Sequence, residues 1–198
     1  MTSEIKDLLQ SEANAVLNIP ISDSFGRAVD LIYHAVHVKK GKLVASGMGK
    51  AGQIALNIAT TLSSTGTPAV YLHAAEAQHG DLGVIQQNDV LLLISNSGKT
   101  REILELVELS KRMFPYIPFI VITGNTKSPL AKVTDIVIDT GNPNEICPLG
   151  LTPTTSTTTM TVIGDILVVL LMKKIGYSTQ DYAKRHHGGY LGEKSRNL

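Results

Sequence analysis

Short apolar runs alternate with longer helical patterns along most of the chain. The runs are uniformly apolar, which is typical of strands that are buried on both faces of a sheet. We predict five strands, at residues 43–45, 69–72, 89–94, 119–122 and 136–138. We predict helices between and after them, at residues 54–64, 100–114, 129–132 and 154–175. This alternation, with right-handed crossovers, favours an α/β fold: a doubly wound, five-stranded parallel sheet flanked by helices, in the order 2-1-3-4-5.

Helical patterns also precede the first strand, within residues 3–37, and Ser22 or Asp23 would cap the second of these helices. No repeat, linker or low-complexity tract divides the sequence. A single domain is therefore expected over residues 1–198, and its last segment, residues 177–198, is predicted to be a short polar tail.

A turn of small polar residues follows the third predicted strand and leads into a helix. Ser95, Ser97 and Thr100 would place their hydroxyls beside the free N–H groups of the helix N-terminus. Asn96 and Gly98 complete the turn. Those donors and the helix dipole together suit a phosphate. The alternative is that Ser97 or Thr100 only caps the helix, but one cap explains one hydroxyl, so we favour an anion site.

A glycine turn follows the first predicted strand, and Gly47, Gly49 and Gly52 match the spacing of a dinucleotide fingerprint. That fingerprint also needs an acidic residue at the end of the second strand, where this chain has His73. A dinucleotide is therefore disfavoured, and we expect the turn to approach a small ligand with Lys50 beside it. A solvated surface lysine is the alternative for Lys50. The predicted strand order brings both turns together where ligands bind in such folds.

Composition narrows the class of protein further. Hydrophobic residues make up 43% of the 198 residues and charged residues 18%, and the net charge of +1 provides no basic field for nucleic acid. No signal peptide opens the chain, and the most apolar run, residues 160–172, contains Asp165 and is too short to span a bilayer. We expect a cytoplasmic protein that binds neither nucleic acid nor membrane. The single cysteine, Cys147, excludes an internal disulfide.

Histidines and carboxylates gather after the second predicted strand, at His73, Glu76, His79 and Asp81. Metal ligation is one reading, because imidazole and carboxylate suit zinc. The spacing matches no fixed metal motif, so hydrogen bonds within the fold or to a substrate are favoured. Glu145, in the loop after the fifth strand, would lie at the same edge of the sheet as the polar turn, although most loop glutamates are simply solvated.

Five motifs together resemble those of a known family. They are residues 46–50 (SGMGK), 64–68 (STGTP), 76–83 (EAQHGDLG), 94–98 (ISNSG) and 147–153 (CPLGLTP). They resemble the sugar isomerase (SIS) domain of arabinose 5-phosphate isomerases, and the resemblance extends over residues 23–193. The serine-rich turn alone indicates only a phosphosugar-binding SIS domain. The third and fifth motifs narrow the resemblance to this branch.

The resemblance implies an aldose–ketose isomerase, a homotetramer that interconverts D-ribulose 5-phosphate and D-arabinose 5-phosphate through an enediol, with no metal or cofactor. The aldose would supply synthesis of the acid sugar Kdo for lipopolysaccharide or capsule. Two alternatives stay open at this point. One is an isomerase of another phosphosugar, and the other is a non-catalytic phosphosugar sensor.

The resemblance also implies roles for individual residues. The implied catalytic residues are Lys50, Glu102, Glu145 and His186, and in such tetramers His186 would reach a neighbouring subunit's site. The implied substrate-binding residues are Gly47, Gly49, Gly66, Thr67, His73, His79, Ser95, Asn96, Ser97 and Thr100. His73 is also linked by the resemblance to an inhibitory zinc ion.

Three features depart from the family pattern. Lys99 stands where an acidic residue is common, which changes the charge of the polar turn. His187 stands where a proline usually follows the tail histidine, so either His186 or His187 could act. Longer members continue into paired CBS domains, whereas this sequence ends at Leu198. We therefore expect no regulation through those domains, and a nucleotide-activated Kdo is a candidate feedback ligand.

Overall fold

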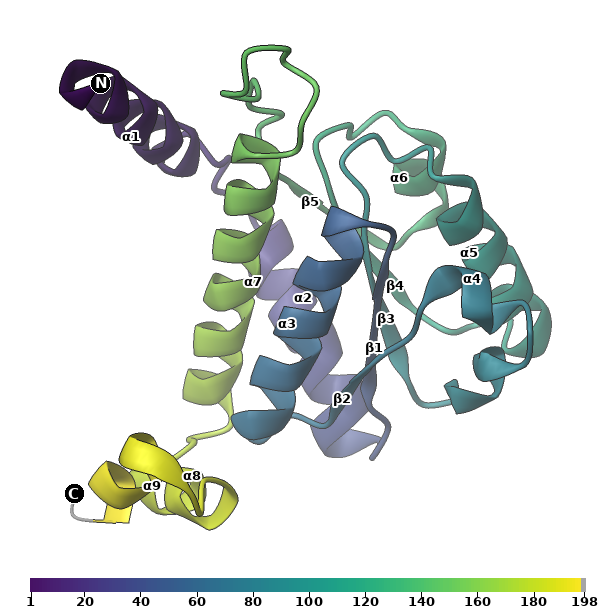
Figure 1. Cartoon of the computed structure of the whole chain (residues 1–198). Coiled ribbons are helices and arrows are strands. Elements are labelled where there is room, and N and C mark those ends of the chain that lie inside the picture. The colour runs from purple at the N-terminus through teal and green to yellow at the C-terminus, as the bar shows by residue number, and fades with distance from the viewer. Residues whose placement is uncertain (197–198) are drawn as a thin grey trace.

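The computed structural model describes residues 1–196 of the chain (Figure 1). Its centre is a five-stranded parallel sheet in the order β2-β1-β3-β4-β5, which confirms the predicted doubly wound fold. The strands are β1 (Leu43–Gly47), β2 (Ala69–Tyr71), β3 (Val90–Ile94), β4 (Phe119–Thr123) and β5 (Ile136–Asp139). All of β1, β3 and β4 is buried, as their continuous apolar runs predict.

Helices cover both faces of this sheet (Figure 1). One face carries α2 (Ser24–Tyr33), α3 (Lys50–Ser64) and α7 (Thr155–Lys174). The other carries α4 (Ala74–Ala77), α5 (Arg101–Met113), α6 (Pro129–Val133) and the 3-10 turn η2 (Asp81–Val84). Alternate strand residues point to opposite faces, so Leu92 packs in the core of the first layer and Leu91 in the core of the second.

The N-terminal helix α1 (Thr2–Leu17) projects from the body of the molecule (Figure 1). None of its residues is buried, and its apolar side chains Ile5, Leu8 and Leu9 are exposed. One polar contact ties it to α7, because the Thr155 hydroxyl donates to Glu12 Oε1 over 2.9 Å. Asp23 occupies the N-cap position of α2, but its side chain makes no capping hydrogen bond. At its other end α2 continues into a π-helical turn, η1 (His34–Val38).

Helix α7 is longer than the apolar run in the sequence. By length and composition its 20 residues could cross a bilayer, which is weak evidence for a membrane span. Half of the apolar stretch of α7 is buried, where the helix packs against the sheet and α3. Asp165 lies on the exposed side of α7. It therefore packs as the core helix of the fold.

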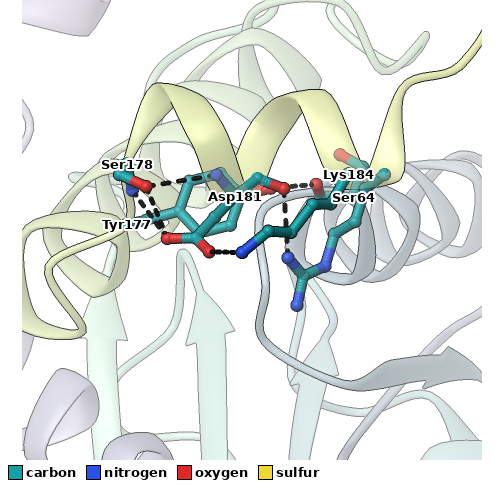
Figure 2. Close-up of polar contacts among 6 residues, drawn as sticks. Ser64, Tyr177, Ser178, Asp181 and Lys184 are labelled. Carbon is teal, nitrogen blue, oxygen red and sulfur yellow. Dashed lines mark hydrogen bonds and ion pairs between the residues drawn. The ribbon is translucent and has the colours of Figure 1, made fainter.

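The segment predicted as a polar tail contains two helices, α8 (Thr179–Arg185) and α9 (Gly189–Arg196). A capping box starts α8: Ser178 Oγ accepts from Asp181 N over 3.1 Å, and Asp181 Oδ2 accepts from Ser178 N over 3.2 Å (Figure 2). Tyr177 anchors the pair to the end of α3, because its hydroxyl donates to the Ser64 carbonyl over 2.9 Å. These local hydrogen bonds give order to a polar segment.

Candidate functional site

A cavity of about 550 Å³ opens at the carboxyl ends of β1, β3, β4 and β5. This is the edge of a doubly wound sheet where ligands bind. The cavity brings together six of the predicted site residues from three separate stretches of the chain. These residues are Lys50, Ser95, Asn96, Ser97, Thr100 and Glu145.

The polar turn between β3 and α5 forms one wall. Ser95 Oγ lies 2.9 Å from Thr100 Oγ1 and accepts from the Gly98 N–H over 3.2 Å. Thr100 is the N-cap residue of α5, but its hydroxyl makes no capping bond to that helix. The capping alternative therefore does not describe Thr100. The first N–H groups of α5 have no acceptor within the helix and remain available to an anion.

Gly98 fixes the shape of this turn. Its φ of +60° is a conformation that residues with a side chain rarely adopt. A Cβ atom added there would lie 2.0 Å from Ser128 Oγ, the side chain that caps α6. The turn is therefore pressed against the start of α6, and only glycine fits at this position.

The glycine turn between β1 and α3 forms the facing wall. A Cβ atom on Gly47 would lie 2.7 Å from the Ala51 carbonyl oxygen, and one on Gly52 would lie 2.7 Å from the Gly47 carbonyl oxygen. These glycines thus serve close packing of the strand against its helix. Gly49 is the N-cap of α3 with φ +57°, and Lys50, the first residue of α3, is exposed at the cavity.

Glu145 enters the cavity from the loop between β5 and α7. Its Oε2 atom accepts from Thr154 N over 2.7 Å, Thr154 Oγ1 over 2.9 Å and Ser156 N over 3.2 Å. Partial burial raises the pKa of the Glu145 carboxyl, but hydrogen bonds from Ser156 and Thr154 outweigh it and leave the pKa below its ordinary value. Glu145 is therefore ionised at neutral pH.

The N-termini of three helices meet at this cavity. Lys50 and Ala51 of α3, Thr100 before α5 and Ser156 of α7 all line it. Each helix directs the positive end of its dipole and its free N–H groups toward the same space. Lys50 and Lys99 add cationic groups to the lining. The electrostatics therefore favour an anionic ligand, with one carboxylate at the far side.

Several buried polar atoms near this edge lack a hydrogen-bond partner within residues 1–196. They are Ser46 Oγ at the end of β1, His73 Nδ1 just after β2 and Asn96 Oδ1 just after β3. Such atoms are rare in folded proteins because burial without a partner costs free energy. Because they lie at one edge of the sheet, polar groups of a ligand bound there could supply the missing hydrogen bonds.

Other predicted residues lie outside the cavity. Glu102 is half-buried in the first turn of α5, His73 is half-buried before α4, and His79 is exposed. Gly66 and Thr67 precede β2, so they lie at the amino edge of the sheet. There Gly66 packs on Tyr177, and Thr67 Oγ1 lies 3.2 Å from the Nε2 atom of His37. Their predicted roles in substrate binding stay predictions.

His186 lies far from the cavity of its own chain. It follows α8 and stacks on Tyr182, with ring centroids 3.7 Å apart, and its Nδ1 atom lies 3.0 Å from the Tyr182 carbonyl oxygen. Ser156, which lines the cavity, is in the first turn of the 20-residue helix α7, and α8 with His186 lies beyond the other end of that helix (Figure 1). A helix of that length spans about 30 Å, so a catalytic role for His186 requires the site of another subunit.

Within residues 1–196, no three side chains of His, Cys, Asp or Glu come together as a metal site. The inhibitory zinc ion that the resemblance links to His73 therefore stays a prediction. The free thiol of Cys147 lies on the same loop as Glu145, and its Sγ accepts from Thr152 N over 3.1 Å and Leu151 N over 3.3 Å. Hydrogen bonds from Thr152 and the neighbouring N–H groups lower the pKa of this thiol to about 7.

Sequence reasoning missed some of the lining. Gly124 and Asn125 follow β4, Asn142 follows β5, and Ser156 and Thr157 begin α7. The residues after β4 and β5 could have been expected, because every strand of a parallel sheet delivers its next residues to the same edge. The approach of α7 depends on tertiary packing, which its threonine-rich start does not reveal.

Fold and cavity together define a class: α/β proteins with a doubly wound parallel sheet and a polar cavity at its carboxyl edge. Residues 37–170 match the family model described as SIS domain, and the chain belongs to the SIS domain family. Arabinose 5-phosphate isomerase KdsD of Pseudomonas aeruginosa is 44% identical over 186 residues, which are 94% of this chain and 55% of the relative. The chain thus spans about half the length of the curated relatives it matches.

Two solved structures are similar over nearly all of the chain. One is a candidate phosphosugar isomerase involved in capsule formation from Bacteroides fragilis, with 64% identity, a TM-score of 0.95 and coverage of 96% of this chain and 99% of that one. The other is an Escherichia coli CFT073 protein in complex with arabinose 5-phosphate, with 35% identity, a TM-score of 0.84 and coverage of 92% of this chain and 95% of that one.

Proposed function

We propose that this chain is an aldose–ketose isomerase that interconverts D-ribulose 5-phosphate and D-arabinose 5-phosphate. The observation that carries the proposal is one cavity that joins a phosphate-binding turn to Lys50 and Glu145. The names of the curated relatives and the arabinose 5-phosphate complex of a similar structure support this substrate. The aldose would supply Kdo synthesis for lipopolysaccharide or capsule, and the protein would work in the cytoplasm.

The reaction moves a proton between C1 and C2 through an enediol. The turn with Ser95, Ser97 and Thr100 holds the phosphate, and this remote binding energy positions the reacting carbons. Lys50 stabilises the oxyanion that develops on the substrate oxygen. Glu145 is ionised and lines the same cavity, so it can accept a proton as a general base. Glu102, half-buried next to the turn, is the second acid–base candidate.

The active assembly is a homotetramer in this proposal. The exposed apolar side chains of α1, Ile5, Leu8 and Leu9, would be covered by another subunit. His186 would then open the sugar ring or shuttle a proton at the cavity of a neighbouring subunit. This role fits the long distance between His186 and the cavity of its own chain. Mixing inactive Lys50→Ala and His186→Ala proteins tests this role. Recovered activity is expected because some sites regain both residues, and a mixture as inactive as its components contradicts the action of His186 in another subunit.

The experiment that tests the function follows D-ribulose 5-phosphate by NMR with the purified protein. We expect D-arabinose 5-phosphate to accumulate until equilibrium is reached. Turnover of a hexulose phosphate but not of ribulose 5-phosphate would favour an isomerase of another sugar. Phosphosugar binding without any turnover would favour a sensor and contradict the proposed activity.

Feedback control is a finer part of the proposal. A nucleotide-activated Kdo is the expected inhibitor, because it is a late product of the pathway that the aldose would feed. Inhibition would appear as a lower rate of ribulose 5-phosphate isomerisation in its presence. An unchanged rate at saturating ligand would remove this part and leave the isomerase proposal intact.

A further inference from the structure

Two carboxylates from different parts of the chain meet the N-terminus of α7. Glu145, in the loop after β5, accepts from Thr154 N over 2.7 Å and from Ser156 N over 3.2 Å. Glu12, in α1, accepts from the Thr155 hydroxyl over 2.9 Å through its Oε1 atom. Three consecutive residues at the start of α7 are thus bound alternately by the two carboxylates.

The start of α7 depends on contacts from outside the helix. Thr154 is the N-cap residue, but its hydroxyl donates to Glu145 Oε2 over 2.9 Å and makes no capping bond to the helix. Threonine and serine, which fill the first turn, are weak helix formers. Thr155 and Ser156 are nevertheless buried. Their order therefore comes from packing and from the two carboxylates.

Helix α1 lies beside the loop that carries Glu145. Residues of α1 and of the loop at 140–146 together line a second cavity of about 400 Å³. Glu145 borders both this cavity and the one at the carboxyl edge of the sheet. Among residues 1–196, neither Glu12 nor Thr155 lines the cavity at the carboxyl edge. The bond between them can therefore affect chemistry in that cavity only through the start of α7 and Glu145.

Glu12 adds little stability through this contact. Its Oε2 atom is buried and has no hydrogen-bond partner in the described part of the chain. A buried carboxylate oxygen without a donor costs free energy, which offsets the hydrogen bond made by Oε1. Because no residue of α1 is buried, the helix adds no core packing that would compensate. The effect of Glu12 is therefore expected on the position of α7.

We propose that Glu12 is a positioning residue for isomerisation: through Thr155 it holds the start of α7, and thereby the orientation of Glu145. The inference rests on the proposed function, because Glu145 must act as the general base. Thr155 lies between the two residues whose N–H groups donate to Glu145, so a shift of Thr155 moves both donors. A misplacement of about 1 Å at a catalytic group can cost about 100-fold in rate.

Steady-state kinetics of Glu12→Ala with D-ribulose 5-phosphate test the inference. We expect kcat to fall at least about tenfold because the base is misplaced, and KM to stay within about twofold because the polar turn is untouched. The affinity for inorganic phosphate, measured by calorimetry, should not change. The midpoint of thermal unfolding should fall by no more than about 4 °C, as loss of one net hydrogen bond predicts. A merely structural role predicts the reverse, a large loss of stability with normal kcat in the folded protein.

Further variants identify the route from Glu12 to Glu145. Glu12→Gln keeps an acceptor for the Thr155 hydroxyl, so it should restore kcat to within about threefold of the wild type. Thr155→Val removes the same hydrogen bond from the other side and should lower kcat as Glu12→Ala does. The two changes combined should be no slower than either alone, because both remove one interaction. Asp7→Ala is the matched control, since it removes an exposed carboxylate from α1, and it should keep the wild-type kcat.

The outcomes separate this inference from the proposed function. A wild-type kcat in Glu12→Ala would overturn the positioning role and leave the isomerase intact. Equal losses of kcat in Glu12→Gln and Glu12→Ala, or in Asp7→Ala and Glu12→Ala, would also overturn it. If Glu12→Ala does not fold, a wild-type kcat in Thr155→Val overturns the role in the same way. If the folded wild-type protein does not isomerise ribulose 5-phosphate, the proposed function fails and the inference fails with it.

Discussion

The two edges of the central sheet differ in whether every buried polar side chain finds a hydrogen-bond partner. At the amino edge, Asp89 is 1% exposed, and its carboxylate accepts from Lys42 N over 2.9 Å, Gln86 N over 2.7 Å and Lys42 Nζ over 2.6 Å. At the carboxyl edge, buried atoms of Ser46 and Asn96 have no partner within residues 1–196.

This difference assigns two roles to the buried polar groups of one sheet: some stabilise the fold, and others are placed to bind a ligand. Polar groups that the chain satisfies itself hold the fold together, because removing one partner leaves the others unpaired. Polar groups left without partners weaken the fold and are retained where a ligand can satisfy them. Changes at the amino edge should therefore lower stability, and changes to the polar turn between β3 and α5 at the carboxyl edge should lower phosphate affinity.

The largest effect on binding is expected for Gly98→Ala. A Cβ atom would meet Ser128 Oγ at 2.0 Å on a backbone that disfavours side chains, so the turn must shift from the conformation that presents its hydroxyls and N–H groups to the cavity. We expect the affinity for inorganic phosphate to fall at least about 100-fold, measured by calorimetry, since several hydrogen bonds are lost together. Gly83→Ala is the control, and equal phosphate affinity in both variants would contradict the assignment of the turn.

Asp89→Ala should give the largest loss of stability. The N–H groups of Lys42 and Gln86 and the Lys42 ammonium all lose their acceptor. We expect a cost of about 3 kcal/mol in the free energy of unfolding, measured by urea titration, with phosphate affinity unchanged in the folded protein. A variant as stable as the wild type would show that this edge does not hold the fold.

Ser95→Ala should change binding by a smaller amount. It removes one hydroxyl that bonds Thr100 Oγ1 and the Gly98 N–H, while the N–H groups of α5 remain. We expect phosphate affinity to fall about tenfold, as for one charge-assisted hydrogen bond. Ser110→Ala is the matched control, because its hydroxyl only bonds the Leu106 carbonyl within α5. A larger loss of affinity in the control would contradict the turn as the phosphate site.

The smallest effect concerns the loop that carries Glu145. Because hydrogen bonds lower the pKa of Cys147 to about 7, its thiolate persists above that pH and is lost below it. Alkylation by iodoacetamide, followed by mass spectrometry, should therefore rise with a midpoint near pH 7. It should be several-fold faster at about pH 7.5 than for an ordinary thiol of pKa about 8.5. Cys147 is the single cysteine, so the signal is unambiguous. A midpoint at the ordinary thiol pKa of about 8.5 would mean that the loop does not hold Sγ as described.

Much of the fold could be predicted because it depends on local patterns. The five apolar runs indicated the strands, and right-handed crossovers indicated their order. The polar turn after β3 and the glycine turn after β1 were predicted to meet, and both line one cavity. Helix α8 was missed although Ser178 and Asp181 have capping-box spacing, because the segment around them lacks an apolar stripe.

The site was harder to predict than the fold. Gly66 and Thr67 precede β2, so chain topology alone assigns them to the amino edge, whereas the family resemblance, which concerns a tetramer, assigned them to the substrate. The left-handed conformation of Asn142 depends on contacts of the loop after β5, and no local motif announces it. His186 can be related to a cavity only through a neighbouring subunit.

The measurement that tests the central claim most directly is solvent deuterium exchange into D-ribulose 5-phosphate, followed by NMR. The wild-type protein should exchange the C1 proton while it forms the aldose. Glu145→Gln should slow this exchange at least about 100-fold, as loss of a general base predicts, while binding inorganic phosphate as tightly as the wild type. Exchange at the wild-type rate in the variant, or no exchange by wild-type protein with ribulose 5-phosphate bound, would contradict isomerisation at the carboxyl edge.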